Sequence, residues 1–332
     1  MKKILLCTLL TLLAALSYGQ GKDSLGFFRR LDRKIYEKKL AKVDPEYISI
    51  PETRWAVGTA TDAHLNHLYI DQHRNGAGYS GTLYTNPEFV QKLGFSWRGM
   101  GLSVPIFNPK WVTPKQKNKN VDYSFSNFGN INGFSATLRI SDSHKGTLES
   151  LAGDKMEVAE GKCHDRSIDL DFYHVFNGRR FSMPAAFGFT QIQKKSAGSA
   201  ILTVALRNGK TTVGPGPGPD NHGMSIISNM LAIGGGYGYN YVTERGWLIH
   251  FAATGNIVVL KNYDMMIGNG IVEDFGAFPD VVLGSQFAVI RNKANLYYGM
   301  NVINRSSLCG SKSSIAFFNS RGNVLVVFGV RF

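Results

Sequence analysis

The sequence predicts an all-β fold: a transmembrane antiparallel β-barrel of 12–14 strands, preceded by a short N-terminal periplasmic helix. Three observations favour this fold. The chain begins with an export signal, its strands alternate apolar and polar residues, and its last strand ends on an aromatic residue, Phe332. The alternating runs are about ten residues long, which is the length that a tilted strand needs to cross a bilayer.

The composition excludes several other classes of protein. The 332 residues include 37 Lys or Arg and 24 Asp or Glu, so the formal net charge is +13. With 43% hydrophobic and 12% aromatic residues, the chain can bury a large core and is not disordered. Three cysteines are too few for a disulfide scaffold. After the N-terminus no apolar run approaches the ~18 residues of a spanning helix.

The first element is a predicted signal peptide at residues 1–19. Lys2 and Lys3 precede an apolar segment at residues 4–16, and small residues stand just before Gln20. This arrangement is typical of a cleaved secretory signal, so we expect an exported protein of the cell outer membrane. Cys7 lies inside the apolar segment instead of after it, which argues against a lipoprotein.

The second element is a predicted periplasmic segment at residues 20–52. Within it, residues 23–43 place Phe28, Leu31 and Ile35 on one side of a helix and many Lys and Arg on the other. A basic amphipathic helix can lie on an anionic membrane surface. A plain periplasmic helix docked on the body is the interpretation that we favour.

The third element, residues 53–332, is the predicted barrel. On one run Ile168, Leu170 and Phe172 alternate with Asp169 and Asp171. A soluble sandwich also alternates, so a periplasmic β-sandwich that binds a ligand stays as an alternative. The export signal and the length of the runs favour the barrel, and a sheet in lipid must close because its edge groups cannot stay unpaired.

Fourteen segments are candidate strands: 54–71, 89–97, 100–107, 120–128, 131–141, 166–176, 181–191, 198–207, 229–242, 246–260, 283–291, 294–304, 312–319 and 323–332. The apolar phase flips at Arg98–Gly99, which predicts a hairpin or a bulge, and a bulge would leave twelve strands. This count puts the long connectors 208–228 and 261–282 on the periplasmic side, where turns are usually short. The alternative is a miscount near residues 181–207. The proline-rich run at 214–219 predicts a loop.

The polar phase of these strands predicts the residues that line the lumen. They are Arg139, Asp169, Asp171, Arg207, Asn240, His250, Gln286, Asn295, Asn301 and Arg331. The apolar phase of the last strand predicts a C-terminal insertion signal for the barrel-assembly machinery, formed by Phe328, Val330 and Phe332.

Few residues suggest catalysis. Asp169 and Asp171 share a face, but a lumen network with arginines explains them better than acid–base chemistry. His174 falls in the lipid-facing series, where a lipid hydrolase would need a histidine beside a serine. A ring in the interfacial belt is the interpretation that we favour. His64 and His67 point to opposite faces of one strand, so they do not form a metal site. We therefore expect no catalytic residue, no cofactor and no metal.

Two further expectations concern the cysteines and the basic loop at residues 114–120. The predicted topology puts Cys163 and Cys309 on opposite sides of the membrane, so they should not pair. The basic loop is expected to be extracellular, where outer-membrane lipid and the phosphates of lipopolysaccharide would attract it, or to be simply solvated. We expect no nucleic-acid partner, and the oligomeric state stays open.

Three runs resemble a known family. They are MPAAFGFTQIQKKSAGSAILTVAL (residues 183–206), GGGYGYNYVTERGWLIHFAATGNIV (234–258) and FVQKLGFSWRGMGLSVPI (89–106). They are similar to the domain-of-unknown-function family 4421, and the resemblance covers most of the mature chain. It implies an outer-membrane protein of Bacteroides-type bacteria and supplies no activity or catalytic residue.

The sequence thus predicts an outer-membrane barrel with a passive role: a small pore, a transport component or a structural barrel. A barrel enzyme that acts on lipid, with His174 as its candidate, is the competing hypothesis. The soluble ligand-binding sandwich is the third.

Overall fold

The computed structural model describes residues 22–332 apart from 75–76, 86–87, 109–119, 143, 151–152, 160, 219–220, 268–269, 273–279, 294 and 311–314. The chain forms two compact units that divide between Lys42 and Val43. In the first unit the structure describes helix α2 (Lys22–Leu40). None of the described helices combines the length and the apolar character needed to span a membrane. The predicted signal peptide and nearly all of the basic loop at 114–120 lie outside the described residues.

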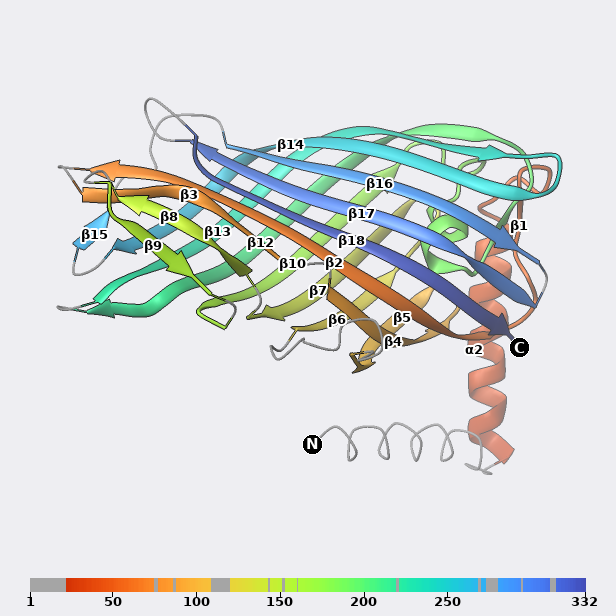
Figure 1. Cartoon of the computed structure of the whole chain (residues 1–332). Coiled ribbons are helices and arrows are strands. Elements are labelled where there is room, and N and C mark those ends of the chain that lie inside the picture. Colours follow the sequence, from red (N-terminus) through yellow and green to blue (C-terminus); the bar gives the residue numbers. More distant parts are fainter. Residues whose placement is uncertain are drawn as a thin grey trace. The chain divides into compact units, whose positions relative to one another are not determined.

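Twelve of the described strands form a closed antiparallel barrel, which confirms the predicted fold class and excludes the sandwich (Figure 1). The ring closes where the last strand pairs with the first, for example through Val330 and Val57. In ring order the strands are β2 (Trp55–Arg74), β4 (Glu88–Trp97), β5 (Met100–Phe107), β6 (Asn120–Asn127), β7 (Asn132–Ser141), β10 (Cys163–Val175), β12 (Ala197–Gly218), β13 (Asn221–Val242), β14 (Trp247–Ile267), β16 (Val281–Asn292), β17 (Leu296–Gly310) and β18 (Ile315–Arg331).

Two of the fourteen candidate strands are not separate strands. Residues 181–191 contain a short π-helix, η1 (Pro184–Gly188), instead of a strand. The candidates 312–319 and 323–332 are one continuous strand, β18. The predicted hairpin at Arg98–Gly99 is present, and both of its residues have positive φ angles, 48° and 100°. The miscount near residues 181–207 was therefore real.

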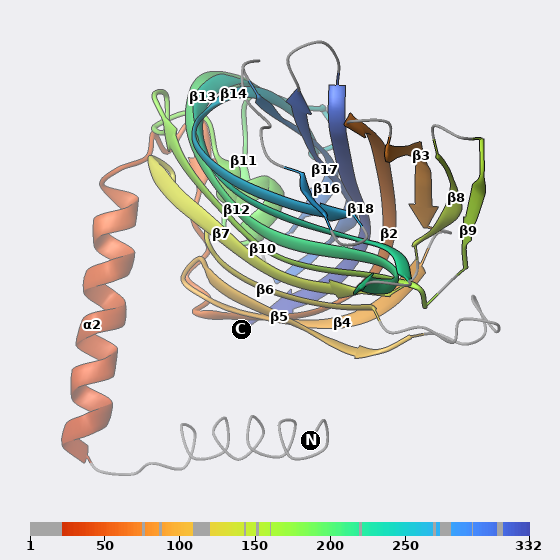
Figure 2. The same cartoon turned by 90° about the vertical axis from the view of Figure 1, so that its left-hand side faces the viewer.

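The two ends of the barrel differ in how far the strands extend and in the segments that connect them. At the terminal end, where β2 begins and β18 ends, the turns are short, as between β13 and β14 at residues 243–246, apart from the long segment between β10 and β12. At the distal end the strands are long, and β3 (Ala77–Thr85), β8 (His144–Ser150) and β9 (Lys155–Val158) extend the sheet from β2 (Figure 2). A short strand, β15 (Gly270–Val272), pairs with β14 there.

The expected placement of 208–228 and 261–282 was wrong. These segments are largely the distal halves of β12, β13 and β14 instead of connectors on the side of the termini. The loop predicted at 214–219 was also wrong for most of its length, because β12 continues to Gly218. Pro217 is opposite His222, after an irregularity in the ladder that begins at Val213.

The outer wall changes from apolar to polar along the strands. On β12, Leu202 and Leu206 are exposed on the outer face, whereas Asn208 and Lys210 follow them in the same phase. On β10, Ile168 is the last exposed apolar residue before polar ones. The apolar belt therefore surrounds the terminal half of the barrel, and the distal half has the outer surface of a soluble protein.

The inner wall changes in the opposite sense. Near the distal end it is packed with apolar side chains from the wall and from the β3–β8–β9 extension: Leu68, Ile70, Leu83, Leu148, Val158, Cys163, Ala205, Val213, Met224, Ile226, Met230, Ala232, Val282, Cys309 and Phe317. This distal core includes both cysteines, which are free. Their expected placement on opposite sides was wrong, because both lie at the distal end.

Candidate functional site

Polar side chains face the lumen at mid-height, between the distal core and the terminal end. On β10, Asp165, Ser167 and Asp169 are buried, while the alternate residues Arg166 and Ile168 are exposed. Because successive side chains of a strand point to opposite faces, the buried set points into the lumen. Buried charges are costly unless they are paired, so the partners of these residues define the site.

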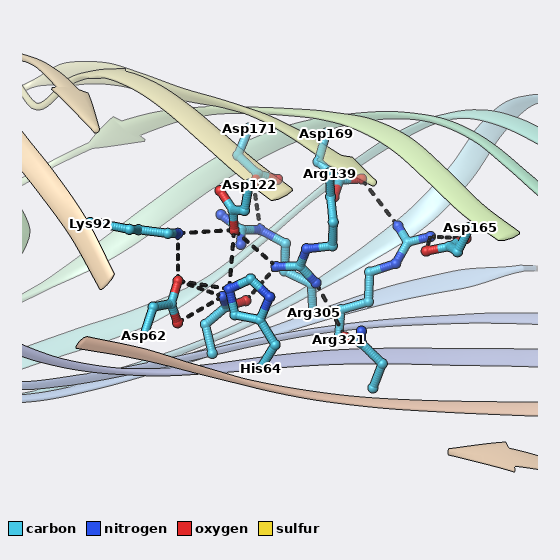
Figure 3. A network of polar contacts seen from close by, with 12 residues as sticks. Asp62, His64, Lys92, Asp122, Arg139, Asp165, Asp169, Asp171, Arg305 and Arg321 are labelled. Carbon is cyan, nitrogen blue, oxygen red and sulfur yellow. Dashed lines mark hydrogen bonds and ion pairs between the residues drawn. The ribbon is translucent and has the colours of Figure 1, made fainter. Parts of the chain in front are cut away.

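Lys92 of β4 lies at the centre of the first charged cluster (Figure 3). Its Nζ is 2.5 Å from Oδ2 of Asp62 and 3.2 Å from Oδ2 of Asp122. Nε2 of His64 is 2.9 Å from the same Asp62 oxygen. All four side chains are almost fully buried. The ammonium group of Lys92 thus bridges two carboxylates that come from β2 and β6.

Arg139 of β7 connects this cluster to the far wall. Its Nη2 lies 3.5 Å from Oδ2 of Asp122 and donates a hydrogen bond of 2.5 Å to Oδ1 of Asn323, on β18. The amide of Asn323 in turn donates to the carboxylate of Asp62 at 3.1 Å. Four strands separate β7 from β18 on the shorter way round the ring. The contact therefore crosses the lumen.

Asp171 of β10 is the centre of the second cluster. Nη2 of Arg207, on the neighbouring strand β12, lies 2.5 Å from Oδ1. Nε of Arg305, on β17, lies 2.7 Å from Oδ2. Each carboxylate oxygen thus accepts one charge-assisted hydrogen bond, from a neighbouring strand and from across the barrel.

Asp165 of β10 is also in contact with the opposite wall. Nη2 of Arg321, on β18, lies 3.2 Å from both of its carboxylate oxygens, and the hydroxyl of Thr211 donates to Oδ1 at 2.8 Å. Nη1 of Arg321 is 3.6 Å from Oδ1 of Asp169. Strands β10 and β18 are diametrically opposite in the ring.

Together these contacts form a belt of charges at mid-height, which we call the lumen network. Among the described residues its members are five carboxylates and five cations, so their formal charges balance. The members are Asp62, Asp122, Asp165, Asp169 and Asp171 with Lys92, Arg139, Arg207, Arg305 and Arg321.

Three members of the first cluster have the ligand types of a metal site. Asp62, His64 and Asp122 offer ligand atoms within 4.8 Å of one another. The ammonium group of Lys92 contacts the oxygens that would hold the ion. A second cation between them would be repelled at short range. The donor set therefore fits a divalent cation poorly while Lys92 is present.

At the terminal end a plug closes the lumen. The segment between β10 and β12 folds inward, and its η1 turn is the green coil inside the barrel in Figure 1. Phe181, Met183 and Phe187 of this segment pack against wall residues such as Ile290 and Val327. Because these aromatic and aliphatic side chains are buried, the plug is part of the core of the barrel.

Polar contacts fix the plug in place. Asn240 donates to the carbonyl oxygen of Ser182 at 3.0 Å and to Oε1 of Gln193 at 2.9 Å, and its Oδ1 is 2.7 Å from Nδ1 of His250. Arg331 donates to the carbonyl oxygen of Phe189 at 2.5 Å. Buried amides with several partners hold one conformation, because each lost partner leaves an unsatisfied group.

The segment before the barrel covers the plug. Strand β1 (Ile48–Ser49) pairs with β11 (Ile192–Gln193), and the side chain of Ile48 is 1% exposed. Lys195 beside it lies 2.8 Å from Oε2 of Glu46, and this hydrogen bond raises the pKa of the Lys195 ammonium group. Residues 43–52, expected to belong with the helix, thus pack with the barrel.

Between plug and network lies a cavity of about 210 Å³. Its walls include Phe128, Phe187 and Tyr297 at the plug, and Lys92 and Asp122 at the network. The cavity therefore has an apolar end and a polar end.

The predicted lumen residues fall into three groups. Arg139, Asp169, Asp171 and Arg207 belong to the network. Asn240, His250 and Arg331 hold the plug, while Gln286 and Asn301 line the cavity. Asn295 is different, because it is exposed in the turn between β16 and β17 and does not lie on a strand.

Sequence reasoning missed six of the ten network members, namely Asp62, Lys92, Asp122, Asp165, Arg305 and Arg321. The signal was present on β2, where Asp62 alternates with Ala63 and is buried. The pairing across the barrel had no signal, because β10 and β18 are far apart in the chain.

His174 lies on the outer wall and does not join the network. Its Nδ1 is 2.8 Å from Oδ1 of Asn132, and its ring packs edge-on against Phe176 with centroids 5.0 Å apart. Its described partners are thus an amide and an aromatic ring, and its place at a membrane interface stays a prediction.

The comparisons with known proteins concern fold and family. Residues 42–332 match the family described as Domain of unknown function (DUF4421). No curated protein matches the chain.

Several solved structures are similar in fold. The β domain of the Bordetella autotransporter BrkA has 11% identity and a TM-score of 0.41, over 82% of this chain and 98% of that one. The translocator domain of the autotransporter NalP from Neisseria meningitidis has 12% identity and a TM-score of 0.36, over 93% and 98%. The outer-membrane protease OmpT from Escherichia coli has 10% identity and a TM-score of 0.36, over 87% and 100%.

Proposed function

Because the chain belongs to the DUF4421 family, a domain of unknown function, we propose its role from its own geometry: an occluded outer-membrane β-barrel that serves as a structural barrel instead of an open pore. The observation that carries this proposal is the set of ion pairs that join opposite walls at mid-height, above all Arg305–Asp171 and Arg321–Asp165.

The outer wall supports a place in a membrane. The terminal half carries the apolar belt, and Tyr237, Tyr239 and Tyr241 are exposed on its outer face close to the terminal end. Aromatic side chains gather at membrane interfaces, because one part of the ring is apolar and the hydroxyl is polar. With the export signal predicted at residues 1–19, the outer membrane is the compartment that fits, and we infer that the terminal end faces the periplasm.

Three layers occlude the lumen. The plug fills the terminal end, the lumen network crosses the middle, and the apolar core fills the distal end. Solutes would have to displace all three layers. A conducting barrel needs a polar, hydrated path. The polar outer face of the distal half instead suits a rigid stem that stands above the membrane.

Liposome swelling tests this role. Vesicles that contain the mature protein should swell in a small sugar no faster than vesicles without protein, and a general porin at the same density serves as the positive control. Rapid swelling with the mature protein would contradict the proposal. Membrane fractionation completes the test, since the protein should co-sediment with outer-membrane markers.

A further inference from the structure

The wall of the barrel is weakest between β5 and β6. Among the described residues these strands share four residue pairs, from Met100–Asn127 to Ser103–Ser124, against seven in the next shortest junction of the ring, β4–β5. Beyond Ser103, residues 104–107 and 120–123 still have strand geometry, but the described ladder between them has ended. We call this stretch the open seam.

Pro105 lies in the open seam and has no N–H to donate. Backbone groups that lack a hydrogen-bond partner are costly in lipid. A junction whose ladder has already ended is therefore where the wall can separate with the least loss of hydrogen bonds. The flanking strand β7 stays paired with β6 along the seam, and β4 stays paired with β5 apart from an irregularity at Ile106.

The cavity adjoins the seam, because residues of both β5 and β6 line it. The side chains at the inward positions of the nearby strands are small, which leaves room for the cavity. They are Gly58 on β2, Gly94 and Ser96 on β4, Gly101 and Ser103 on β5, and Ser124 and Ser126 on β6, and all of them line the cavity. A Cβ added at Gly94 would meet nothing closer than the carbonyl oxygen of Gly58, at 3.6 Å. The lining also includes Leu102, whose side chain is exposed on the outer wall.

The cavity has the two ends of an amphiphile site. Phe187 and Tyr297 form its apolar end. At its polar side, Oδ1 of Asp122, Oε1 of Gln286 and Oδ1 of Asn301 are buried acceptors that receive no hydrogen bond from the described residues. Buried acceptors without a donor are costly, so a ligand hydroxyl would be stabilised there.

We propose that the open seam is a lateral portal from the bilayer into the cavity, which takes a small lipid-soluble amphiphile with an apolar ring or short chain and one hydroxyl group. The apolar belt outside the seam, including Ile106 and Phe107, lets such a molecule arrive through the membrane. The occluded lumen then holds it without opening a path for ions.

Photolabelling in vesicles tests the portal. The probe is a trifluoromethyl-diazirine derivative of benzyl alcohol, which partitions into bilayers and carries a ring and a hydroxyl. After irradiation we expect labelled peptides from the inward residues Ser126 and Phe187, besides the lipid-facing residue Phe328. Gly94→Leu fills the cavity, so labelling at Ser126 and Phe187 should fall about tenfold while labelling at Phe328 stays unchanged.

A cross-link across the seam tests the portal independently of the cavity. If the register continued past Ser103, Val104 would stand opposite Tyr123. Cysteines at these positions, in a chain with Cys163→Ala and Cys309→Ala, are joined by oxidation, or by a bismaleimide if the gap exceeds disulfide reach. The joined protein should lose the inward labelling. The matched control joins Leu102→Cys to Phe125→Cys in the paired half of the junction and should keep it.

Two results would overturn the proposal. One is wild-type labelling confined to the outer wall. The other is inward labelling that survives both Gly94→Leu and the Val104–Tyr123 cross-link. Neither result bears on ion conductance, so the proposed structural role is tested separately.

Discussion

Arg305 of β17 reaches across the lumen to Asp171 of β10, and its Nε lies 2.7 Å from Oδ2 of the carboxylate. Four strands separate β10 from β17 on the shorter way round the ring. An ion pair at this position joins opposite walls of the barrel, so it both stabilises the barrel and obstructs its lumen.

Arg305→Met should lower the free energy of unfolding by about 2 kcal/mol, because Asp171 keeps Arg207 but loses one of two charged donors. Asp171→Asn should behave similarly. Urea unfolding of both single variants and of the double variant gives a coupling energy, which we expect at roughly 0.5–3 kcal/mol. Lys155→Met, at an exposed site on β9, is the control. A coupling energy near zero would mean that the contact does not tie the walls.

Lys92→Met should be more damaging, at about 3–5 kcal/mol, because it leaves two buried carboxylates without the cation that bridges them. Adding Asp62→Asn in the same chain should restore part of the loss. Unfolding in lipid vesicles measures both variants. A Lys92→Met variant as stable as the wild type would contradict the pairing at 2.5 Å and 3.2 Å.

Zinc binding should distinguish the Lys92→Met variant from the wild type. Without Lys92, the oxygens of Asp62 and Asp122 and the ring of His64 are free to bind a divalent cation. Zn²⁺ should therefore raise the thermal midpoint of Lys92→Met and leave that of the wild type unchanged. An equal rise in both would show that Lys92 does not occupy the site.

Leu170 and Asp169 test the two faces of β10. Leu170→Arg puts a charge into the lipid-facing belt and should cost roughly 2–4 kcal/mol near the midplane. Asp169→Asn should cost about 1 kcal/mol, because its closest arginine nitrogens are 3.5 Å and 3.6 Å away. Unfolding free energies in vesicles decide the order. If Asp169→Asn were the worse variant, the strand would be inside out.

The long strands show where sequence reasoning stopped. On β12 the lipid-facing pattern ends at Leu206, and the next outward residues are Asn208 and Lys210. A search for apolar residues on the lipid side therefore ends the strand there. The structure continues it to Gly218, because beyond the belt the apolar residues move to the inside, as Val213 does.

The plug was missed in the sequence for a different reason. Residues 181–191 are apolar enough to resemble a strand, yet Pro184 begins a π-turn and Phe189 has a positive φ of 52°. The fold class and most lumen positions followed from alternation, which is a local property. The network and plug depend on contacts between strands that are distant in the sequence, such as Arg331 with Phe189, and one sequence contains no record of those.

Phe332 tests the insertion signal. Its side chain is 62% exposed at the end of the barrel, while its backbone pairs with Trp55 across the closing junction. Phe332→Asp should reduce the amount of protein in the outer membrane and leave aggregated or degraded chain, because a charge replaces the terminal aromatic of the signal. Quantitative blotting of membrane fractions measures this. Normal levels of the Phe332→Asp variant in the outer membrane would show that Phe332 is not part of the insertion signal.

Single-channel recording tests whether ion pairs, plug and distal core together occlude the lumen. The mature protein is inserted into planar bilayers at high salt, with insertion verified by protease protection. We expect no regular conductance steps from the wild type, and none from Arg305→Met, because the plug and the distal core remain. Stable, uniform steps from the wild-type protein would contradict occlusion and assign the barrel to the pores.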